Sequence, residues 1–154
     1  MSELIEEQDK LLEVLLVEDS PGDLRLTREA FSEAKLPVRL HVASDGIEAM
    51  AFLRKEGIYA DAPRPDFILL DLNLPRMDGR EVLATIKEDE DLRTIPTVIL
   101  TTSESDVDIM QSYQLKANAF LSKPVQLDAF ERLIVSIGDF WITQVKLPQN
   151  QGWE

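Results

Sequence analysis

Short apolar runs alternate with helical patterns five times along this chain of 154 residues, and this alternation restricts the possible folds more than any other feature. Most of the runs are nearly continuous, without the polar residue at every second position that a strand facing water shows. Strands of that kind are covered on both faces, as in a parallel sheet with helices on either side. The sequence therefore predicts one α/β domain with a doubly wound parallel sheet.

The predicted elements follow each other with little chain between them. The strands are expected at 13–17, 39–43, 67–71, 97–101 and 119–124, and the helices at 21–34, 45–57, 80–90, 103–115 and 125–148. Ser20 is the expected N-cap of the first helix, with Pro21 at its first position and Asp23 in its first turn. In a sheet of this kind the functional crevice lies beyond the carboxyl ends of the strands.

The composition limits the classes of partner and of chemistry. A formal net charge of -13 disfavours a nucleic-acid backbone or an anionic membrane as the main partner, because both would be repelled. The absence of cysteine excludes disulfides and thiolate chemistry, and it fits a reducing compartment. No apolar run reaches membrane-spanning length, and the start, MSELIEEQDK, lacks the features of a signal peptide. We therefore expect a cytoplasmic protein.

Ligating or reactive side chains stand where four of the predicted strands end. They are Glu18 and Asp19 after the first strand, Asp71 at the end of the third, Thr101 at the end of the fourth and Lys123 in the fifth. Carboxylates within a few ångströms of each other repel, and a cation relieves that repulsion. Because the ligands are oxygens, Mg²⁺ fits best, whereas Ca²⁺ fits less well without a helix-flanked loop of acidic ligands.

Asp71 stands directly after an apolar run, where an ionised group is costly unless it is paired or reacts. The sequence lacks the GxxxxGK[ST] loop, the GxSxG elbow and a histidine placed as a general base. What remains is a carboxylate nucleophile beside a metal ion and a lysine, the ingredients for an aspartyl phosphate. Mg²⁺ and Lys123 would offset the charge of the phosphoryl oxygens, and Thr101 could donate a hydrogen bond to one of them.

Four short motifs, LLVEDS, LLDLNLPRMDG, VILTTS and FLSKP, follow each other in an order that resembles the response-regulator receiver domain of two-component systems. The resemblance spans nearly the whole chain. It implies a flavodoxin-like sheet with the strand order 2-1-3-4-5 and helices on both faces. It also implies that the protein accepts a phosphoryl group from a histidine kinase.

The resemblance assigns a role to each matching residue. Asp71 becomes the phosphoacceptor, and Thr101 and Lys123 contact the phosphoryl group. The Mg²⁺ ligands are Asp19, Asp71 and the backbone carbonyl of Asn73, with Glu18 reaching the ion through water. Thr101 and Phe120 form the switch, in which the aromatic side chain turns inward when the threonine is drawn to the phosphate.

Two residues depart from the usual receiver pattern. Thr102 replaces the small residue that commonly follows the signalling threonine, so a bulkier side chain is expected to narrow access to the phosphoryl group. Phe120 replaces the commoner tyrosine and has no hydroxyl, so the switch is expected to depend on packing alone.

A closer resemblance links FILLDLNLPRMDGREVLATIK, IPTVILTTSESD and DFWITQVKLP to the stand-alone response regulators that work with phytochrome histidine kinases. It implies a phytochrome kinase as partner and an output through another, unknown protein. The expected organisation is an acidic extension at 1–12, a receiver domain at 13–148 with an extended last helix, and a polar tail at 149–154. The protein is expected not to be an enzyme, because it would have no independent substrate.

The predicted last helix is longer than the strands, so its end should overhang the sheet. Phe140, Trp141 and Val145 lie in that overhang, where apolar surface favours a partner. We expect a homodimer through the helix at 103–115, the strand at 119–124 and the helix at 125–148.

Three alternatives remain open. The chain could be a pseudo-receiver that binds partners without being phosphorylated, although such proteins usually lose one of the key residues. A phosphatase of the haloacid dehalogenase type would need a DxD motif near the first strand. A flavodoxin-like cofactor binder would need a phosphate-cradling loop after that strand.

Overall fold

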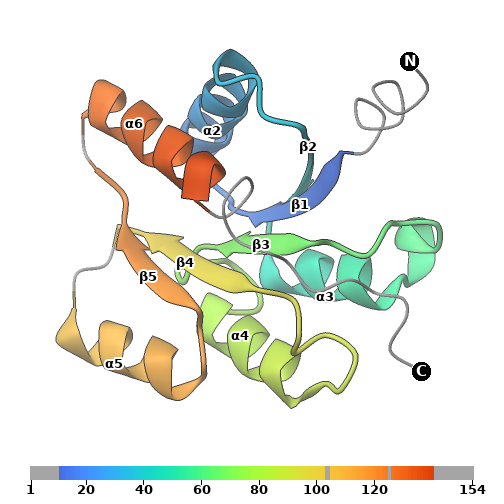
Figure 1. Ribbon diagram of the computed structural model, residues 1–154. Coiled ribbons are helices and arrows are strands. Elements are labelled where there is room, and N and C mark those ends of the chain that lie inside the picture. Colours follow the sequence, from blue (N-terminus) through green and yellow to red (C-terminus); the bar gives the residue numbers. More distant parts are fainter. Residues whose placement is uncertain (1–10, 103–104, 125, 141–154) are drawn as a thin grey trace.

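The computed structural model describes residues 11–102, 105–124 and 126–140 (Figure 1). These residues form a five-stranded sheet with the order β2-β1-β3-β4-β5, in which every pair of neighbouring strands is parallel. The predicted doubly wound sheet and its strand order are confirmed.

The strands lie close to their predicted positions. Their bounds are β1 Leu12–Val17, β2 Val38–Ala43, β3 Phe67–Leu70, β4 Thr97–Thr101 and β5 Ala119–Ser122. Every residue of β3 and β4 is buried, because both strands lie inside the sheet and are covered on both faces. This burial on both faces explains why the sequence of these strands is a nearly continuous apolar run.

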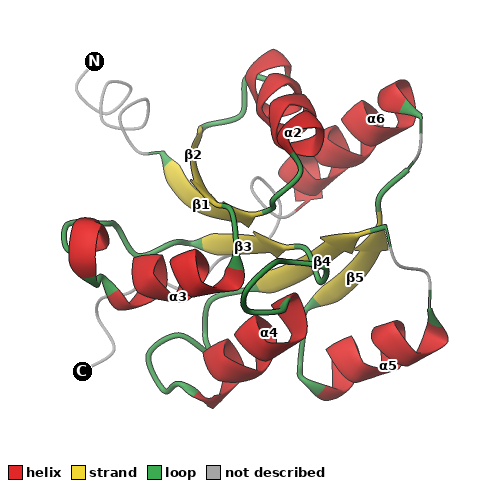
Figure 2. Cartoon of the chain, turned by 180° about the vertical axis from the view of Figure 1, so that it is seen from behind, coloured by secondary structure: helices red, strands yellow, loops and turns green. Residues whose placement is uncertain are grey.

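The described residues also form five helices, one after each strand, and a short 3₁₀ turn after α3. Their bounds are α2 Pro21–Glu33, α3 Gly46–Arg54, η1 Gly57–Tyr59, α4 Gly79–Glu88, α5 Asp106–Gln114 and α6 Leu127–Ile137. Helices α2 and α6 cover one face of the sheet, and α3, α4 and α5 cover the other, as the two opposite views show (Figures 1 and 2).

The helices begin at side-chain caps that follow the strands. The Ser20 hydroxyl accepts a hydrogen bond from the backbone N–H of Asp23 at 3.3 Å, and Pro21 occupies the start of α2, as predicted. Asp45, Asp78 and Ser105 cap α3, α4 and α5 in the same way. Each of these four caps lies between a strand and the helix that follows it, so the four helices begin at the carboxyl edge of the sheet.

Alternate side chains of each central strand enter two separate cores. Val14 and Leu16 pack with Phe31 of α2 and Phe130 of α6, whereas Leu15 faces the core under α3 and α4. This division follows from the period of two residues in a strand. The sheet is therefore held by packed cores on both of its faces.

The helices predicted at 45–57 and 125–148 differ from the structure at their ends. The helix predicted at 45–57 ends at Arg54, because Lys55 adopts the left-handed conformation with φ 57°. The helix predicted at 125–148 begins at Leu127, and residues 138–140 form a π-helical turn after α6. Trp141, Val145, the predicted tail at 149–154 and residues 1–10 of the predicted extension lie outside the described residues.

Within the described part of the chain, no helix is both long and apolar enough to cross a membrane.

Candidate functional site

Three carboxylates meet at the carboxyl edge of the sheet. Glu18 and Asp19 follow β1, and Asp71 follows β3, the neighbouring strand. One oxygen from each carboxylate lies within 4.8 Å of the others. Glu18 and Asp71 are buried, whereas Asp19 is exposed, so the cluster opens to solvent on the side of Asp19. The predicted acidic residues are therefore brought together.

Backbone hydrogen bonds fix the positions of these residues. The N–H of Asp71 donates to the carbonyl of Val17 at 3.0 Å, and the N–H of Glu18 donates to the carbonyl of Ala43 at 3.0 Å. These bonds extend the parallel ladder by one residue beyond each strand. The Glu18 carboxylate also accepts hydrogen bonds from the N–H groups of Asp19 and Ser20, at 3.0 and 3.2 Å. Both buried carboxylates are thus held by the sheet itself.

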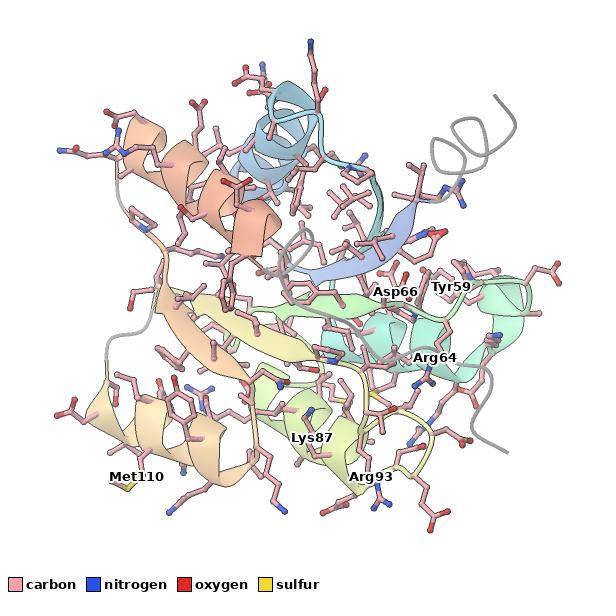
Figure 3. All side chains as sticks on the ribbon, viewed as in Figure 1. Tyr59, Arg64, Asp66, Lys87, Arg93 and Met110 are labelled. Carbon is pink, nitrogen blue, oxygen red and sulfur yellow. The ribbon has the colours of Figure 1, made fainter. Side chains whose placement is uncertain are left out.

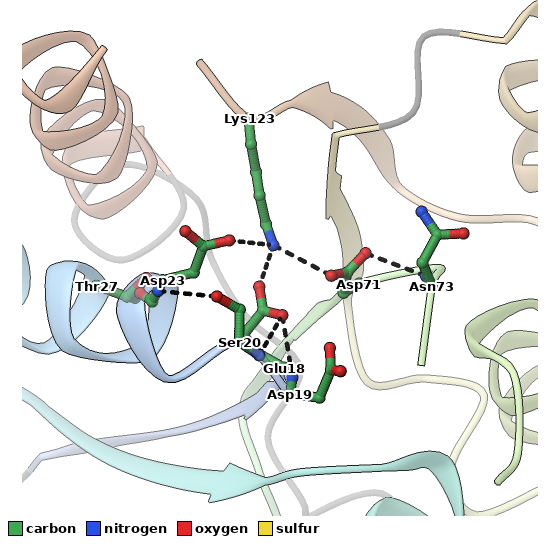
Figure 4. A network of polar contacts seen from close by, with 8 residues as sticks. All are labelled: Glu18, Asp19, Ser20, Asp23, Thr27, Asp71, Asn73 and Lys123. Atoms are coloured by element: carbon green, nitrogen blue, oxygen red, sulfur yellow. Dashed lines mark hydrogen bonds and ion pairs between the residues drawn. The ribbon is translucent and has the colours of Figure 1, made fainter. Parts of the chain in front are cut away.

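Lys123 follows β5 and extends over the acidic cluster (Figure 4). Its Nζ contacts Glu18 Oε1 and lies 3.0 Å from Asp23 Oδ2 and 3.1 Å from Asp71 Oδ2. The Lys123 side chain is only 5% exposed, so the ammonium is removed from water and depends on these carboxylates for compensation. The predicted lysine is at the predicted site.

The crowding of charge changes the protonation of the site. Burial raises the pKa of Glu18 to about 7; contact with Lys123 opposes this rise, and the charge of Asp71 adds to it. Burial on its own lowers the pKa of Lys123, but the bond with Glu18 and the charge of Asp71 outweigh it and raise that pKa. The lysine therefore stays protonated, and in the metal-free protein Glu18 holds a proton more tightly than a free glutamate does.

Of the other predicted site residues, Asn73 and Thr101 form hydrogen bonds with members of this centre. The backbone N–H of Asn73 donates to Asp71 Oδ1 at 3.1 Å, and its side chain is exposed. Thr101 is the buried last residue of β4, and its carbonyl accepts from the N–H of Lys123 at 2.7 Å. Phe120 is partly buried and packs against the core on the side of α3 and α4, and its backbone N–H donates to the Tyr113 hydroxyl at 3.3 Å.

Asp23 is a member of the site that the sequence analysis missed. It was placed only in the first turn of a helix, yet its carboxylate is one of three that contact Lys123. The signal that could have identified it is its position, because a helix that begins directly after Asp19 puts its first turn over the same edge of the sheet. The partner, however, lies 100 residues away in the chain.

The loop after Asp71 is folded tightly against itself. The N–H of Gly79 donates to the carbonyl of Leu72 at 2.9 Å. A Cβ at Gly79 would lie 2.1 Å from the carbonyl oxygen of Asp71, and a Cβ at Gly46 would lie 2.1 Å from that of Met77. Only glycine allows these approaches, so the start of α4 is in direct contact with the candidate phosphoacceptor.

The donor set fits a hard divalent cation. Its members Glu18, Asp19 and Asp71 offer only carboxylate oxygens, which Mg²⁺ prefers over nitrogen and sulfur ligands. Two of them are buried next to each other, an arrangement that one lysine compensates only in part. When bound, a divalent cation supplies positive charge beside Asp71.

Comparison with known proteins agrees with this geometry. The sequence profile of the response regulator receiver domain matches residues 14–135. Response regulator Rcp1 of Synechocystis sp. (strain ATCC 27184 / PCC 6803 / Kazusa) is 47% identical over 135 residues, which cover 88% of this chain and 92% of Rcp1.

Solved structures lead to the same family. The Mn²⁺-bound form of Rcp1 has a TM-score of 0.86 and 46% identity, and the match covers 90% of this chain and 99% of that one. The phosphorylated cyanobacterial phytochrome response regulator RcpA has a TM-score of 0.88 and 46% identity, with 91% and 100% covered. The divalent metal of the Rcp1 structure agrees with the Mg²⁺ that the acidic cluster fits. The chain therefore belongs to the response regulator receiver domain family.

Proposed function

We propose that this protein accepts a phosphoryl group from a sensor histidine kinase onto Asp71 in a Mg²⁺-dependent reaction, and relays the signal by binding another protein. The observation that supports this most directly is the 3.1 Å contact between Lys123 Nζ and Asp71 Oδ2, at the side of the acidic cluster. A buried lysine beside a carboxylate nucleophile is suited to receive the charge of an incoming phosphoryl group.

The proposed reaction transfers a phosphoryl group between two nucleophiles. A carboxylate oxygen of Asp71 forms a bond to phosphorus while the bond from phosphorus to the kinase histidine nitrogen breaks, and the histidine leaves with that electron pair. Lys123 donates N–H groups to the phosphoryl oxygens, and Thr101 donates its hydroxyl to one of them. Asp19, Asp71 and the backbone carbonyl of Asn73 would hold Mg²⁺, with Glu18 holding it through water.

Thr101 and Phe120 are the proposed switch. Thr101 lies at the carboxyl end of β4, and Phe120 pairs in register with Ile99 of that strand. Because Phe120 is already packed against the core, a shift of Thr101 toward the phosphoryl group would change the space available to this side chain. The absence of a hydroxyl on Phe120 leaves packing as the coupling between them.

The proposed kinase partner is a phytochrome. The support is the relation to RcpA, which is a phytochrome response regulator, at 46% identity over 91% of this chain. The protein would work in the cytoplasm, where histidine kinases obtain their phosphoryl group from ATP. It would not be an enzyme, since Asp71 itself is the acceptor and no separate substrate is turned over. The receiver would extend over residues 13–148, with an acidic extension at 1–12 and a polar tail at 149–154.

A homodimer through α5, β5 and α6 is part of the proposal. Val107, Met110 and Tyr113 recur every three residues along α5, and each is more than half exposed. Met110 points away from the sheet (Figure 3). Met110→Glu should convert a dimer to a monomer in analytical ultracentrifugation. Ile58→Glu, at a 91% exposed position on η1, is the matched control and should leave the dimer intact.

Mass spectrometry after incubation with acetyl phosphate and Mg²⁺ tests the phosphoacceptor. The wild-type protein should gain the mass of one phosphoryl group, and the gain should disappear in Asp71→Asn and after chelation of Mg²⁺. An unlabelled wild-type protein would instead support the pseudo-receiver that binds partners without phosphorylation. Transfer from a phytochrome kinase should then be faster than transfer from an unrelated histidine kinase.

A further inference from the structure

We propose that Asp23 is a positioning residue that shortens the lifetime of the phosphorylated state, because it binds one of the three N–H donors of Lys123. The inference rests on the proposed function of Asp71. It concerns a carboxylate that is not among the proposed metal ligands, and it explains a contact that phosphorylation chemistry alone does not require.

The three donors of the Lys123 ammonium are all engaged before phosphorylation. A lysine ammonium has three N–H groups, and Nζ contacts three carboxylates, those of Glu18, Asp23 and Asp71. A phosphoryl group on Asp71 brings new acceptor oxygens to the same place. Lys123 can bind them only with the donors that Glu18 and Asp23 leave available.

Glu18 and Asp23 differ in what a bound cation does to them. Glu18 belongs to the acidic cluster that fits Mg²⁺, so a cation would compete with Lys123 for its carboxylate. Asp23 is outside that cluster, and its 3.0 Å contact with Nζ has no such competitor. Asp23 is therefore the carboxylate expected to hold Lys123 both with and without the metal.

The position of Asp23 is fixed by α2. Its backbone N–H donates to the Ser20 hydroxyl at 3.3 Å, and its carbonyl accepts from the Thr27 hydroxyl at 2.7 Å (Figure 4). The side chain is 30% exposed, so solvent weakens the ion pair with Lys123 without removing it. A carboxylate held in this way draws the ammonium toward α2 and away from Asp71.

The charge of Asp23 also opposes the phosphorylated state directly. Phosphorylation replaces the single negative charge of Asp71 with a phosphoryl group that carries about two negative charges. In the hydrolysis that ends the signal, the oxygen of one water molecule bonds to phosphorus, the bond from phosphorus to the Asp71 oxygen breaks, and both protons of the water leave on inorganic phosphate. The Asp23 carboxylate, which shares Lys123 with the phosphoryl group, therefore raises the free energy of the phosphorylated protein. Hydrolysis then becomes faster, and the lifetime of the phosphorylated state becomes shorter.

Asp23→Asn is the test variant, because asparagine keeps the shape and the backbone hydrogen bonds but removes the charge. After labelling with acetyl phosphate at saturating Mg²⁺, the lifetime of the phosphorylated state should increase about fivefold, the size expected for a partly exposed ion pair. Mg²⁺ affinity of the unphosphorylated protein, measured by calorimetry, should fall, because a nearby negative charge is lost and Lys123 turns to the cluster carboxylates. A structural defect would lower both quantities, so their opposite changes identify the positioning role.

Two variants complete the experiment. Glu29→Gln removes the same charge from an exposed position on the same helix and should change neither quantity. Asp23→Glu keeps the charge and should restore a lifetime near that of the wild type. Equal lifetimes in Asp23→Asn and wild type, with both proteins fully labelled, would overturn the positioning role and leave the phosphoacceptor intact. A wild-type protein that takes no label would overturn the proposed function itself.

Discussion

Arg80 in the first turn of α4 binds Asp108 on α5, with 2.6 Å between Nη2 and Oδ1 and 3.0 Å between Nε and the same oxygen. The same guanidinium pairs with the α4 cap residue Asp78 at 3.1 Å. Asp78 ends the loop that begins at Asp71, so a continuous chain of polar contacts connects the candidate phosphorylation loop to α5. The bond with Asp108 is the largest cause that raises the pKa of Arg80.

Loss of this bridge should loosen α5. We expect Arg80→Gln to lower the free energy of unfolding by about 1 kcal/mol, since the Arg80 side chain is 28% exposed and its bond with Asp108 is charge-assisted. Urea denaturation measures the loss, and hydrogen exchange should show faster exchange in α5 than in α4. Arg132→Gln is the control, because Arg132 is 71% exposed and its pair with Asp128 should contribute nothing measurable.

Removal of the lysine should make the protein depend on Mg²⁺. Lys123→Met leaves buried Glu18 and Asp71 without their cation, so the metal-free variant should lose about 3 kcal/mol of unfolding free energy. Added Mg²⁺ should restore most of that loss and bind more tightly than to the wild type, because a competing positive charge is gone. Thermal unfolding with and without Mg²⁺ measures both effects.

Lys87→Met is the matched control for this prediction. Burial lowers the pKa of Lys87, and its Nζ lies 3.3 Å from the carbonyl of Arg93. The Lys87 variant should respond to Mg²⁺ as the wild type does. An equal response of the two lysine variants would contradict the assignment of Lys123 to the metal-binding edge.

The raised pKa of Glu18 predicts two pH dependences. The folded metal-free protein binds the Glu18 proton more tightly than the unfolded chain does, so this contribution to stability is complete below pH 4.5 and is lost as the pH rises through about 7. Mg²⁺ binding requires the carboxylate, so its affinity should rise with pH up to about 7 and then level off. Glu18→Gln should flatten both profiles, and calorimetric titrations at several pH values check this. An unchanged affinity profile in Glu18→Gln would assign the titration to another group.

A methyl group at Gly79 should damage the fold. Its Cβ would lie 2.1 Å from the Asp71 carbonyl oxygen and 2.6 Å from Leu72 Cα, and both neighbours are backbone. We expect Gly79→Ala to cost about 3 kcal/mol in chemical denaturation. Gly22→Ala is the control in α2, where the nearest atom is 4.0 Å away, and it should stabilise by about 0.5 to 1 kcal/mol.

The parts of the structure that local signals determine could be predicted from the sequence. The apolar run Phe67–Leu70 predicts a strand that is buried along its whole length, as it is in the structure. Ser20 caps α2 because its hydroxyl accepts a hydrogen bond from a free N–H at the start of the helix. Asp71 could be recognised from its position after that run. The strand order came from family resemblance, because the apolar pattern shows where a strand lies in the sequence but not which strand pairs with it.

The remaining features depend on contacts between distant residues. To predict the pairing of Asp23 with Lys123, one must know the order of the strands and the position of α2 over the sheet. The sequence around Asp23 or Lys123 contains neither kind of information. Helix α3 ends at Arg54 because Lys55 takes a left-handed φ of 57°, although Gly57 two residues later was the expected stop. Such a conformation of lysine has no local sequence signature.

The close approaches of Gly79 to Asp71 and of Gly46 to Met77 leave no free space between the loop at 71–79 and the helices α3 and α4. We therefore expect a displacement at Asp71 to be transmitted toward β4, β5 and α5. The tight packing of α3 and α4 against this loop would thus direct the response to one side of the central strand β3, the side of β4 and β5. Protein engineers who wish to redirect the signal should leave the loop at 71–79 untouched and exchange side chains on α5.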